Sequence, residues 1–235
     1  MSGSKSLQEL SRPSYWDNRY AGKFDPETEE IIHENGNEGE ENVAAKKEIE
    51  SFDWFKNFQS LKPFFEKHLP SPGEKREEGN GPRILHLGCG NSTLTYDLHT
   101  LGCRNQISVD FSEVVIQRMS EKYSDLNITW TVMDVRDMKL KDGEIDVAID
   151  KGTLDAMIHG SMWDPPQEVR ENVGRYADEV ARVLKSGGQW LYITYRQPHF
   201  MKPFLLREGI WETEMEILGG ESGAFEYFGW RMKKL

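Results

Sequence analysis

The sequence predicts an α/β fold in which a mostly parallel β-sheet is covered by helices on both faces, a doubly wound arrangement. Strand-like and helix-like segments alternate between residues 83 and 194, and such alternation is typical of parallel strands joined by helices. The pattern then changes to two β-like runs, 211–218 and 224–232, with a glycine-rich stretch between them. These two runs predict an antiparallel hairpin at the C-terminal end of the sheet.

Apolar periodicity and turn signals assign the alternating segments in order. The expected elements are strand 83–87, helix 93–101, strand 106–109, helix 113–123, strand 128–132, strand 145–149, helix 168–184 and strand 189–194. Ser112 is expected to be the N-cap of the second of these helices, which carries apolar residues at four-residue spacing. The last helix has a similar apolar face, and we expect it to stop at Gly187 and Gly188.

Two further helices are expected before the alternating region. Residues 14–20 predict a short helix with Ser14 as its N-cap and Asp17 in its first turn, and residues 57–68 predict a second helix. Between them, residues 25–50 carry ten acidic residues against two lysines and few large apolar residues, which predicts a mobile acidic insertion. The expected organisation is an N-terminal helical cap segment 1–24, the acidic insertion 25–50, a cap helix and linker 51–82, and a core 83–235.

Composition restricts the possible function. The 235 residues, of which 37% are hydrophobic, suffice for one domain with a sizeable core. No apolar run approaches the roughly 20 residues that span a bilayer, and no signal-peptide pattern is present, so we expect a cytoplasmic protein without a membrane partner. The net charge is -11, of which residues 25–50 hold -8 (two lysines against ten acids). This balance disfavours a nucleic-acid partner. Cys89 and Cys103 lack metal-ligand spacing, and we expect neither a disulfide nor a metal site.

The ends of four predicted strands carry glycine or an acid. Gly88 and Gly90 follow the first strand, Asp110 ends the second, and Asp134 and Asp150 follow the third and fourth. Because the carboxyl ends of parallel strands meet at one edge of the sheet, these residues should lie close together. Glycines allow a ligand to approach the backbone, and an acid at the second strand can accept hydrogen bonds from both ribose hydroxyls. The pattern therefore predicts an adenosine-bearing cofactor.

The residues after the glycine turn help to choose the cofactor. A dinucleotide-binding turn usually has a third glycine that allows close packing of helix and strand. Here Gly90 is followed by Asn91, Ser92 and Thr93, so a pyrophosphate site is weakened. A nicotinamide oxidoreductase is therefore a disfavoured interpretation.

With these features, the chain resembles the class I, seven-stranded, Rossmann-like methyltransferases that depend on S-adenosylmethionine, over about residues 83–235. Six segments resemble more narrowly the methyltransferase-like proteins that modify lysines of translation elongation factor 1-alpha: 15–20 (YWDNRY), 52–55 (FDWF), 87–92 (LGCGNS), 111–116 (FSEVVI), 133–135 (MDV) and 150–156 (DKGTLDA). The resemblance implies S-adenosylmethionine as cofactor, S-adenosylhomocysteine as product, no metal, and a protein lysine as acceptor, as in translation elongation factor 1-alpha.

The resemblance also implies roles for the residues of the glycine turn and the second strand. Gly88 and Gly90 would lie against the amino-acid part of the cofactor, with the amide of Asn91 nearby. Asp110 would hold the ribose hydroxyls, and Phe111 would lie against the adenine.

Further positions would complete the cofactor site in the same way. Asp134 would accept from the adenine amino group, the Val135 N–H would donate to a ring nitrogen, and Lys151 would contact the cofactor through its backbone or its ammonium. Three aromatic residues would form a lid over the methionine end, with an ordinary core role as the alternative: Trp16, Tyr20 and Trp54. His86 stands where many of these enzymes have an acid, and we expect a buried strand residue there.

Methyl transfer requires few dedicated catalytic residues, because a sulfonium methyl group is already activated and mainly needs an aligned acceptor and a dry site. A lysine amine has a pKa of about 10.4 and must first lose a proton. Asp150 is the first candidate to orient or deprotonate it, with a capping role as the alternative, and Asp155 is the second. Tyr195 and His199 are candidates to line the acceptor channel.

Two alternative functions stay open. The fourth strand is not followed by Asn-Pro-Pro-Tyr/Phe, which lowers the case for methylation of a base or a glutamine amide. A small-molecule methyltransferase is the alternative among enzymes, and a catalytically silent cofactor-binding scaffold that docks a partner is the alternative outside them. A protein substrate is the favoured partner, and the chain is expected to act as a monomer.

Overall fold

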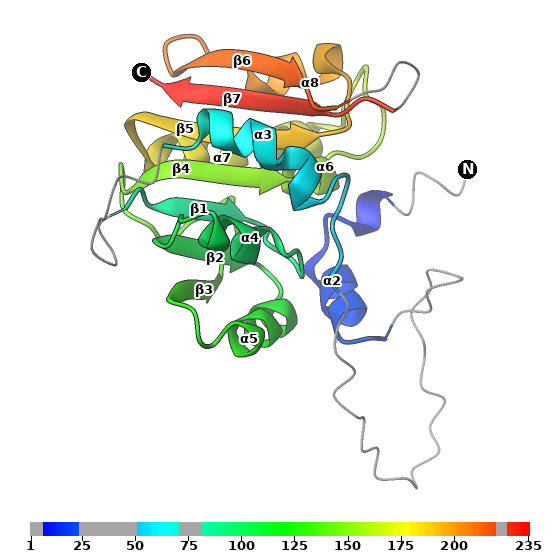
Figure 1. Cartoon of the computed structure of the whole chain (residues 1–235). Helices are drawn as coiled ribbons and strands as arrows, with labels where there is room; N and C mark the ends of the chain where they lie inside the picture. The colour runs from blue at the N-terminus through cyan, green and yellow to red at the C-terminus, as the bar shows by residue number, and fades with distance from the viewer. Residues whose placement is uncertain (1–6, 24–50, 71–80, 220–224) are drawn as a thin grey trace, which may run out of the picture.

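The computed structural model describes residues 7–23, 51–70, 81–219 and 225–235, and the acidic insertion expected at 25–50 lies outside the described residues. The strands are β1 (Ile84–Leu87), β2 (Gln106–Asp110), β3 (Ile128–Val132), β4 (Ile145–Lys151), β5 (Leu184–Thr194), β6 (Trp211–Ile217) and β7 (Phe228–Lys234). They form one seven-stranded sheet in the order β3-β2-β1-β4-β5-β7-β6 (Figure 1).

The sheet confirms the expected fold class. Strands β1 to β5 pair in parallel, whereas β7 pairs antiparallel with both β5 and β6. The predicted terminal hairpin is therefore present, although its second strand covers Phe228–Lys234 rather than 224–232. Because β1 lies between β2 and β4, the order of connection reverses beside β1, and ligands bind at the carboxyl ends of strands at such a reversal.

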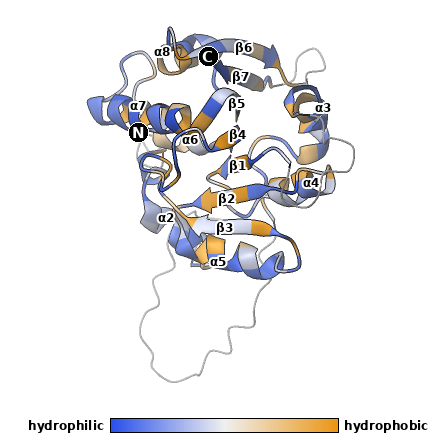
Figure 2. Cartoon of the chain, turned by 90° about the vertical axis from the view of Figure 1, so that its left-hand side faces the viewer, coloured by the Kyte–Doolittle hydropathy of each residue, from blue (hydrophilic) through white to orange (hydrophobic). Residues whose placement is uncertain are grey.

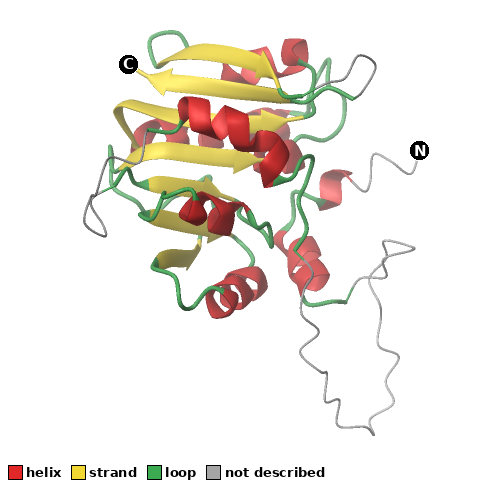
Figure 3. Cartoon of the chain, viewed as in Figure 1, coloured by secondary structure: helices red, strands yellow, loops and turns green. Residues whose placement is uncertain are grey.

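Helices cover both faces of the sheet (Figure 3). They are α2 (Pro13–Tyr20), α3 (Phe58–His68), α4 (Leu94–Thr100), α5 (Glu113–Lys122), α6 (Thr153–Met157), α7 (Gln167–Val183) and α8 (Pro198–Leu205). Helices α3 and α4 pack on one face, and α6, α7 and α8 pack on the other. Figure 2 shows hydrophobic residues along the central strands and hydrophilic residues on the outer turns of the helices.

Successive side chains along a strand point to opposite faces of the sheet, so they pack against different helical layers. In β4, Val147 and Ile149 pack towards α3, whereas Ala148 packs towards α7. In β1, Ile84 and Leu85 divide between the layers in the same way. This double burial explains why the central strands read as continuous apolar runs.

Helix α3 belongs to the core, whereas the sequence assigned it to a cap. Its N-cap is Asn57, whose side chain accepts a hydrogen bond from the Ser60 N–H (3.1 Å). Its buried residues, among them Leu61 and Phe65, pack with Ile149 and Leu191 of the sheet. The folded core therefore begins well before residue 83.

Three local expectations are corrected by the structure. Ser14 is an exposed residue inside α2 and not its N-cap, because Pro13 already supplies the fixed φ angle that suits a first helical residue. Helix α7 ends at Val183 rather than at the glycines 187–188, which lie within β5 where its pairing with β4 is irregular. The short helices α6 and α8 were not expected from the sequence.

The expected N-cap of α5 is present. The Ser112 side chain accepts from the Val115 N–H (3.5 Å) at the start of α5, as predicted for an N-cap. Cys89 and Cys103 are free and buried. Within the described ranges, none of the helices combines the length and the apolar character that crossing a membrane requires.

Gly229 of β7 lets α3 approach the sheet, and this contact gives a stability prediction. A Cβ atom at Gly229 would lie 2.7 Å from Cε2 of Phe64. We expect Gly229→Ala to lower the free energy of unfolding by about 1–3 kcal/mol, because the packed helix must shift. Gly174→Ala in α7 is the matched control, because nothing beyond the helix's own backbone lies within 4 Å of the added Cβ. This substitution should raise the free energy of unfolding by about 0.5–1 kcal/mol. Urea unfolding measures both, and equal effects would contradict the packing interpretation.

Candidate active site

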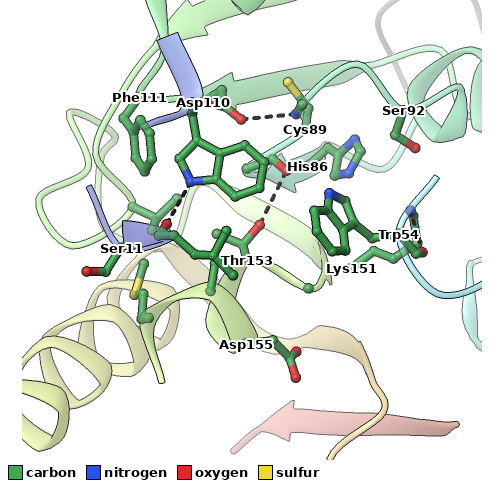
Figure 4. Close-up of a pocket in the computed structure, with 18 of the residues that line it drawn as sticks. Ser11, Trp54, His86, Cys89, Ser92, Asp110, Phe111, Lys151, Thr153 and Asp155 are labelled. Atoms are coloured by element: carbon green, nitrogen blue, oxygen red, sulfur yellow. Dashed lines mark hydrogen bonds between the residues drawn. The ribbon is translucent and has the colours of Figure 1, made fainter. Parts of the chain in front are cut away.

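A cavity of about 260 Å³ lies at the carboxyl ends of β1, β2 and β4, beside α2 and the segment 52–55 (Figure 4). It brings together all but one of the cofactor-binding and catalytic residues that the sequence predicted. The predicted residues that line it are Trp16, Tyr20, Trp54, Gly88, Gly90, Asn91, Asp110, Phe111, Asp134, Val135, Lys151 and Asp155. Asp150 does not line the cavity.

The glycine turn after β1 forms one wall. Gly88 and Gly90 have φ angles of 61° and 52°, in the left-handed region that favours glycine. A Cβ at Gly88 would collide with the Thr153 side chain, and one at Gly90 would lie 2.8 Å from the Tyr20 hydroxyl. The turn therefore brings the backbone to the cavity where a side chain has no space.

Asp110 ends β2 at the next wall. It is buried, and its carboxylate accepts from the N–H groups of Gly90 (3.0 Å) and Ser112 (3.0 Å). Burial raises the pKa of Asp110 to about 6, although these hydrogen bonds oppose the rise. A carboxylate offers about four acceptor sites, so Asp110 keeps capacity for a hydroxyl of a ligand.

The loop after β3 contributes a paired acid. Arg136 donates to Asp134 from its backbone N–H (2.8 Å), from Nε (2.9 Å) and from Nη2 (2.7 Å). Burial alone would raise the pKa of Asp134, but the hydrogen bonds and charge of Arg136 outweigh it and lower the pKa. Val135, between the two, is buried.

Aromatic side chains from the N-terminal segments line the cavity. Trp16 stacks on Tyr20 with ring centroids 5.8 Å apart and meets Trp54 edge-on at 6.0 Å. Helix α2 is attached to the core by Asp17, which accepts from the Ser112 hydroxyl (2.6 Å). Trp16 also packs in a cluster with residues of α5, so the lid and core interpretations both describe it.

A buried ion pair that the sequence did not predict joins the segment 52–55 to the core. The Lys151 ammonium lies 3.2 Å from Asp53 and donates to the Trp54 carbonyl (3.0 Å). Asp53 also accepts from the hydroxyls of Ser92 (2.5 Å) and Thr93 (3.4 Å). Burial lowers the pKa of Lys151, and Asp53 opposes the shift. Asp53 is the one acidic residue in the FDWF motif, and this could have indicated from the sequence that it pairs with a cation.

Asp150 forms the hydrogen bonds of a capping residue, the role that the sequence left open as its alternative. Its buried carboxylate accepts from the N–H groups of Thr153 (2.8 Å) and Leu154 (3.0 Å) at the start of α6, and from the Tyr176 hydroxyl (2.8 Å). Burial raises its pKa to about 7. Its oxygens are thus used to position the helix that carries the next part of the wall.

Asp155, the second candidate, lines the cavity from α6. Its carboxylate accepts from the hydroxyls of Tyr192 (2.7 Å) and Thr194 (2.7 Å). Nε of Arg196 lies 3.1 Å from the same carboxylate, without the alignment of a hydrogen bond, so this contact is an attraction of charges. Burial raises the pKa of Asp155, and the charge of Arg196 opposes it.

Of the two residues considered for the acceptor channel, Tyr195 lines the cavity and His199 does not. Tyr195 lines the cavity, next to Arg196 in the segment after β5. His199 is exposed and packs against Trp163 and Phe200. His199 is therefore not part of the cavity wall.

His86 is buried, as expected from its place in β1. Its Nδ1 lies 2.7 Å from the Thr95 hydroxyl, and burial lowers its pKa to about 3, so the ring is neutral near pH 7. Among the residues that the structure describes, no group of three or more His, Cys, Asp or Glu side chains is arranged to hold a metal ion.

Comparisons with known proteins agree with this geometry. A family model described as a methyltransferase domain matches residues 78–219. The chain is 38% identical over 152 residues to the EEF1A lysine methyltransferase 4 of Mus musculus and 32% identical over 189 residues to that of Bos taurus. These matches cover 63% and 79% of this chain but only 56% and 62% of the relatives, so the chain spans less than two thirds of their length.

A solved structure shows the same fold. It is a SAM-dependent methyltransferase of Leishmania major, which superposes with a TM-score of 0.56 at 11% sequence identity. The superposition covers 75% of this chain and 71% of that protein.

The pair of Lys151 and Asp53 gives a testable prediction. The two side chains are 3% and 19% exposed, so Asp53→Ala leaves a buried ammonium without its counter-charge. We expect a loss of about 3 kcal/mol in the free energy of unfolding, measured with urea. The double variant Asp53→Ala/Lys151→Met should recover part of it, because no buried charge is left.

An exposed ion pair supplies the control. Asp164, whose side chain is 86% exposed beside Arg170, should change stability little when replaced by alanine. The prediction for Asp53 and Lys151 is contradicted if the double variant loses as much free energy of unfolding as its two single variants together, because their charges would then not be coupled.

Proposed function

This chain belongs to the family of methyltransferase domains, and from that premise we propose that it transfers a methyl group from S-adenosylmethionine to a lysine of translation elongation factor 1-alpha. The similarity to two EEF1A lysine methyltransferases carries the choice of substrate. The cavity supports the choice of cofactor, because its lining suits an adenosine-bearing ligand.

The residues of the cavity fit the cofactor. The turn at Gly88 and Gly90 leaves no space for a Cβ atom, and Asp110 is a buried carboxylate with remaining acceptor capacity. We assign the amino-acid part of the cofactor to this turn and to Asn91, and the ribose hydroxyls to Asp110. When bound, the cofactor supplies a methyl group on a positively charged sulfur.

The adenine would lie at the ends of β2 and β3. Phe111 offers a ring face, Val135 a backbone N–H, and Asp134 a carboxylate whose position is set by Arg136. Trp16, Tyr20 and Trp54 would cover the methionine end and exclude water, with Lys151 holding the segment of Trp54 in place. Exclusion of water matters because it keeps solvent from competing for the reacting groups.

The acceptor amine would enter beside Thr153, Asp155 and Tyr195, which line the cavity at the ends of β4 and β5. Removal of an amine from water disfavours its charged form and lowers its pKa, which assists loss of the proton. We propose Asp155 rather than Asp150 as the carboxylate that orients the amine, because Asp155 lines the cavity and Asp150 does not. Arg196 and two hydroxyls hold Asp155 in position.

We also propose that the protein is cytoplasmic and acts as a monomer. A translation factor as substrate is consistent with a cytoplasmic location. A small-molecule acceptor is the competing proposal among enzymes. No feature of the cavity favours a catalytically silent scaffold, because its glycines and acids are all present.

The proposed function predicts transfer of label to one protein. With radiolabelled S-adenosylmethionine, the chain should label purified translation elongation factor 1-alpha, and mass spectrometry should find the methyl group on a lysine. The same factor with its lysines chemically acetylated beforehand is the control, and should take up little label, because an amide nitrogen has no lone pair free to attack the methyl group. Label that enters only the small-molecule fraction of a cell extract would contradict the proposal.

Asp110 predicts a pH dependence of cofactor binding. Its pKa is raised to about 6 by burial, and only the ionised carboxylate can accept from both ribose hydroxyls. The affinity for S-adenosylhomocysteine should therefore be constant above pH 7 and fall below about pH 6, approaching tenfold per pH unit for one proton. Calorimetry between pH 5 and 8 measures this.

Asp110→Asn is the matched variant, because it keeps the shape of the side chain and removes its charge. It should bind S-adenosylhomocysteine about tenfold or more weakly at pH 7.5, with no loss of affinity specific to the range around pH 6. An affinity of the unmodified protein that stays constant down to pH 5 would show that Asp110 does not hold the ligand.

A further inference from the structure

Four aromatic rings form a closed group at the rim of the cavity, which we call the aromatic quartet: Phe55, Tyr195, Phe225 and Tyr227. The ring centroids of successive members lie 5.2 Å (Phe55 to Tyr195), 6.3 Å (Tyr195 to Phe225), 5.4 Å (Phe225 to Tyr227) and 5.9 Å (Tyr227 to Phe55) apart. Phe55 and Tyr195 line the cavity, whereas Phe225 is 65% exposed. The quartet thus extends from the cavity wall to the protein surface.

The quartet borders the end of the cavity away from the cofactor residues. The strand order places the ends of β2 and β3, with Asp110 and Asp134, on one side of β1, and the ends of β4 and β5 on the other. Tyr195 follows β5, and Phe55 packs on Gly152 after β4. An acceptor that reached the cavity along the quartet would therefore arrive opposite the adenosine end.

Phe55 has a backbone conformation that is strained for a bulky residue. Its φ angle of 70° makes it the non-glycine residue with positive φ in the described part of the chain. A Cβ at Gly152, itself at φ 94°, would lie 3.0 Å from Cε2 of Phe55, so the ring needs a glycine beneath it. Strain of this kind concentrates at functional sites, where surrounding contacts maintain it.

Cations already lie on the faces of two quartet rings. The Lys56 ammonium lies 5.0 Å from the centroid of Tyr227, and the Arg196 guanidinium carbon lies 5.2 Å from that of Tyr195. Aromatic faces attract ammonium groups at such distances, more strongly when water is excluded. The contact of Lys56 shows that a lysine side chain can lie on this group of rings, with its ammonium over a ring face.

We propose that the aromatic quartet is the entry site for the acceptor, and that its occupant is a lysine side chain of a protein substrate. The rings pack the aliphatic part of that side chain, and their faces attract its ammonium on the way to the cavity. The proposal rests on the proposed lysine methyltransferase function and adds to it the residues that select the acceptor, Phe55 and Tyr195 inside and Phe225 outside.

Phe225 separates a protein acceptor from a small one. A small molecule contained in the cavity would not reach Phe225, because this ring does not line it. A lysine that projects from a protein surface brings its own chain to the rim, where the exposed ring of Phe225 can contact it. Effects at Phe225 therefore report on the class of acceptor.

The experiment compares Phe225→Ala and Phe55→Gly with the unmodified protein. Phe225 is largely exposed, and glycine tolerates the backbone conformation of residue 55, so both variants should fold. We expect KM for translation elongation factor 1-alpha to rise roughly fivefold to tenfold in each, equivalent to about 1–1.4 kcal/mol. The Kd of the factor for the protein saturated with S-adenosylhomocysteine should rise equally, and Phe225→Ala should leave kcat and the affinity for S-adenosylhomocysteine unchanged.

Tyr96→Ala is the matched control. Tyr96 is an exposed aromatic residue of α4 that stacks on Tyr123 and does not line the cavity, so its variant should match the unmodified protein. The proposal is overturned if both quartet variants behave like Tyr96→Ala, or if Phe225→Ala weakens S-adenosylhomocysteine binding as much as it weakens binding of the factor. Failure of the proposed function is distinct, because the unmodified protein would then put no label on the factor at all.

Discussion

The buried charge of Lys151 is the constraint on which the arrangement of the site depends. An ammonium that is almost wholly removed from water needs a counter-charge, and Asp53 supplies it from a segment almost one hundred residues earlier in the chain. That pairing holds the segment 52–55 against the ends of β1 and β4. The same segment carries Trp54 into the cavity wall and Phe55 into the aromatic quartet, so one ion pair helps to position both rings.

The charges that line the cavity are distributed unevenly in a way that suits the proposed chemistry. Asp134 is paired with Arg136, and Asp155 with Arg196. Of the carboxylates that line the cavity, Asp110 is the one that forms no ion pair with a lysine or arginine of the described residues. A carboxylate hydrogen-bonded mainly by backbone N–H groups is well suited to neutral hydroxyl donors, as in a ribose, because it does not require a charged ligand.

One sheet carries the residues proposed for the cofactor and those proposed for the acceptor. The reversal of connection beside β1 opens a site at the carboxyl ends of the strands, so that β1, β2 and β3 provide the cofactor end and β4 and β5 the acceptor end. Asp150 does not line the cavity but caps α6, and thereby helps to place Thr153 and Asp155. Catalysis of this kind depends on alignment and exclusion of water more than on a strong base.

The sequence by itself determined the order of the strands along the chain, the doubly wound class and which residues stand at the strand ends, because periodicity and strand ends are local features. Only the tertiary structure decided that α3 belongs to the core, that Asp150 caps a helix while Asp155 faces the cavity, and that Asp53 and Phe55 belong to the site. Those roles arise from contacts between segments distant in sequence. Such contacts depend on register, packing and burial, which no local pattern of residues records.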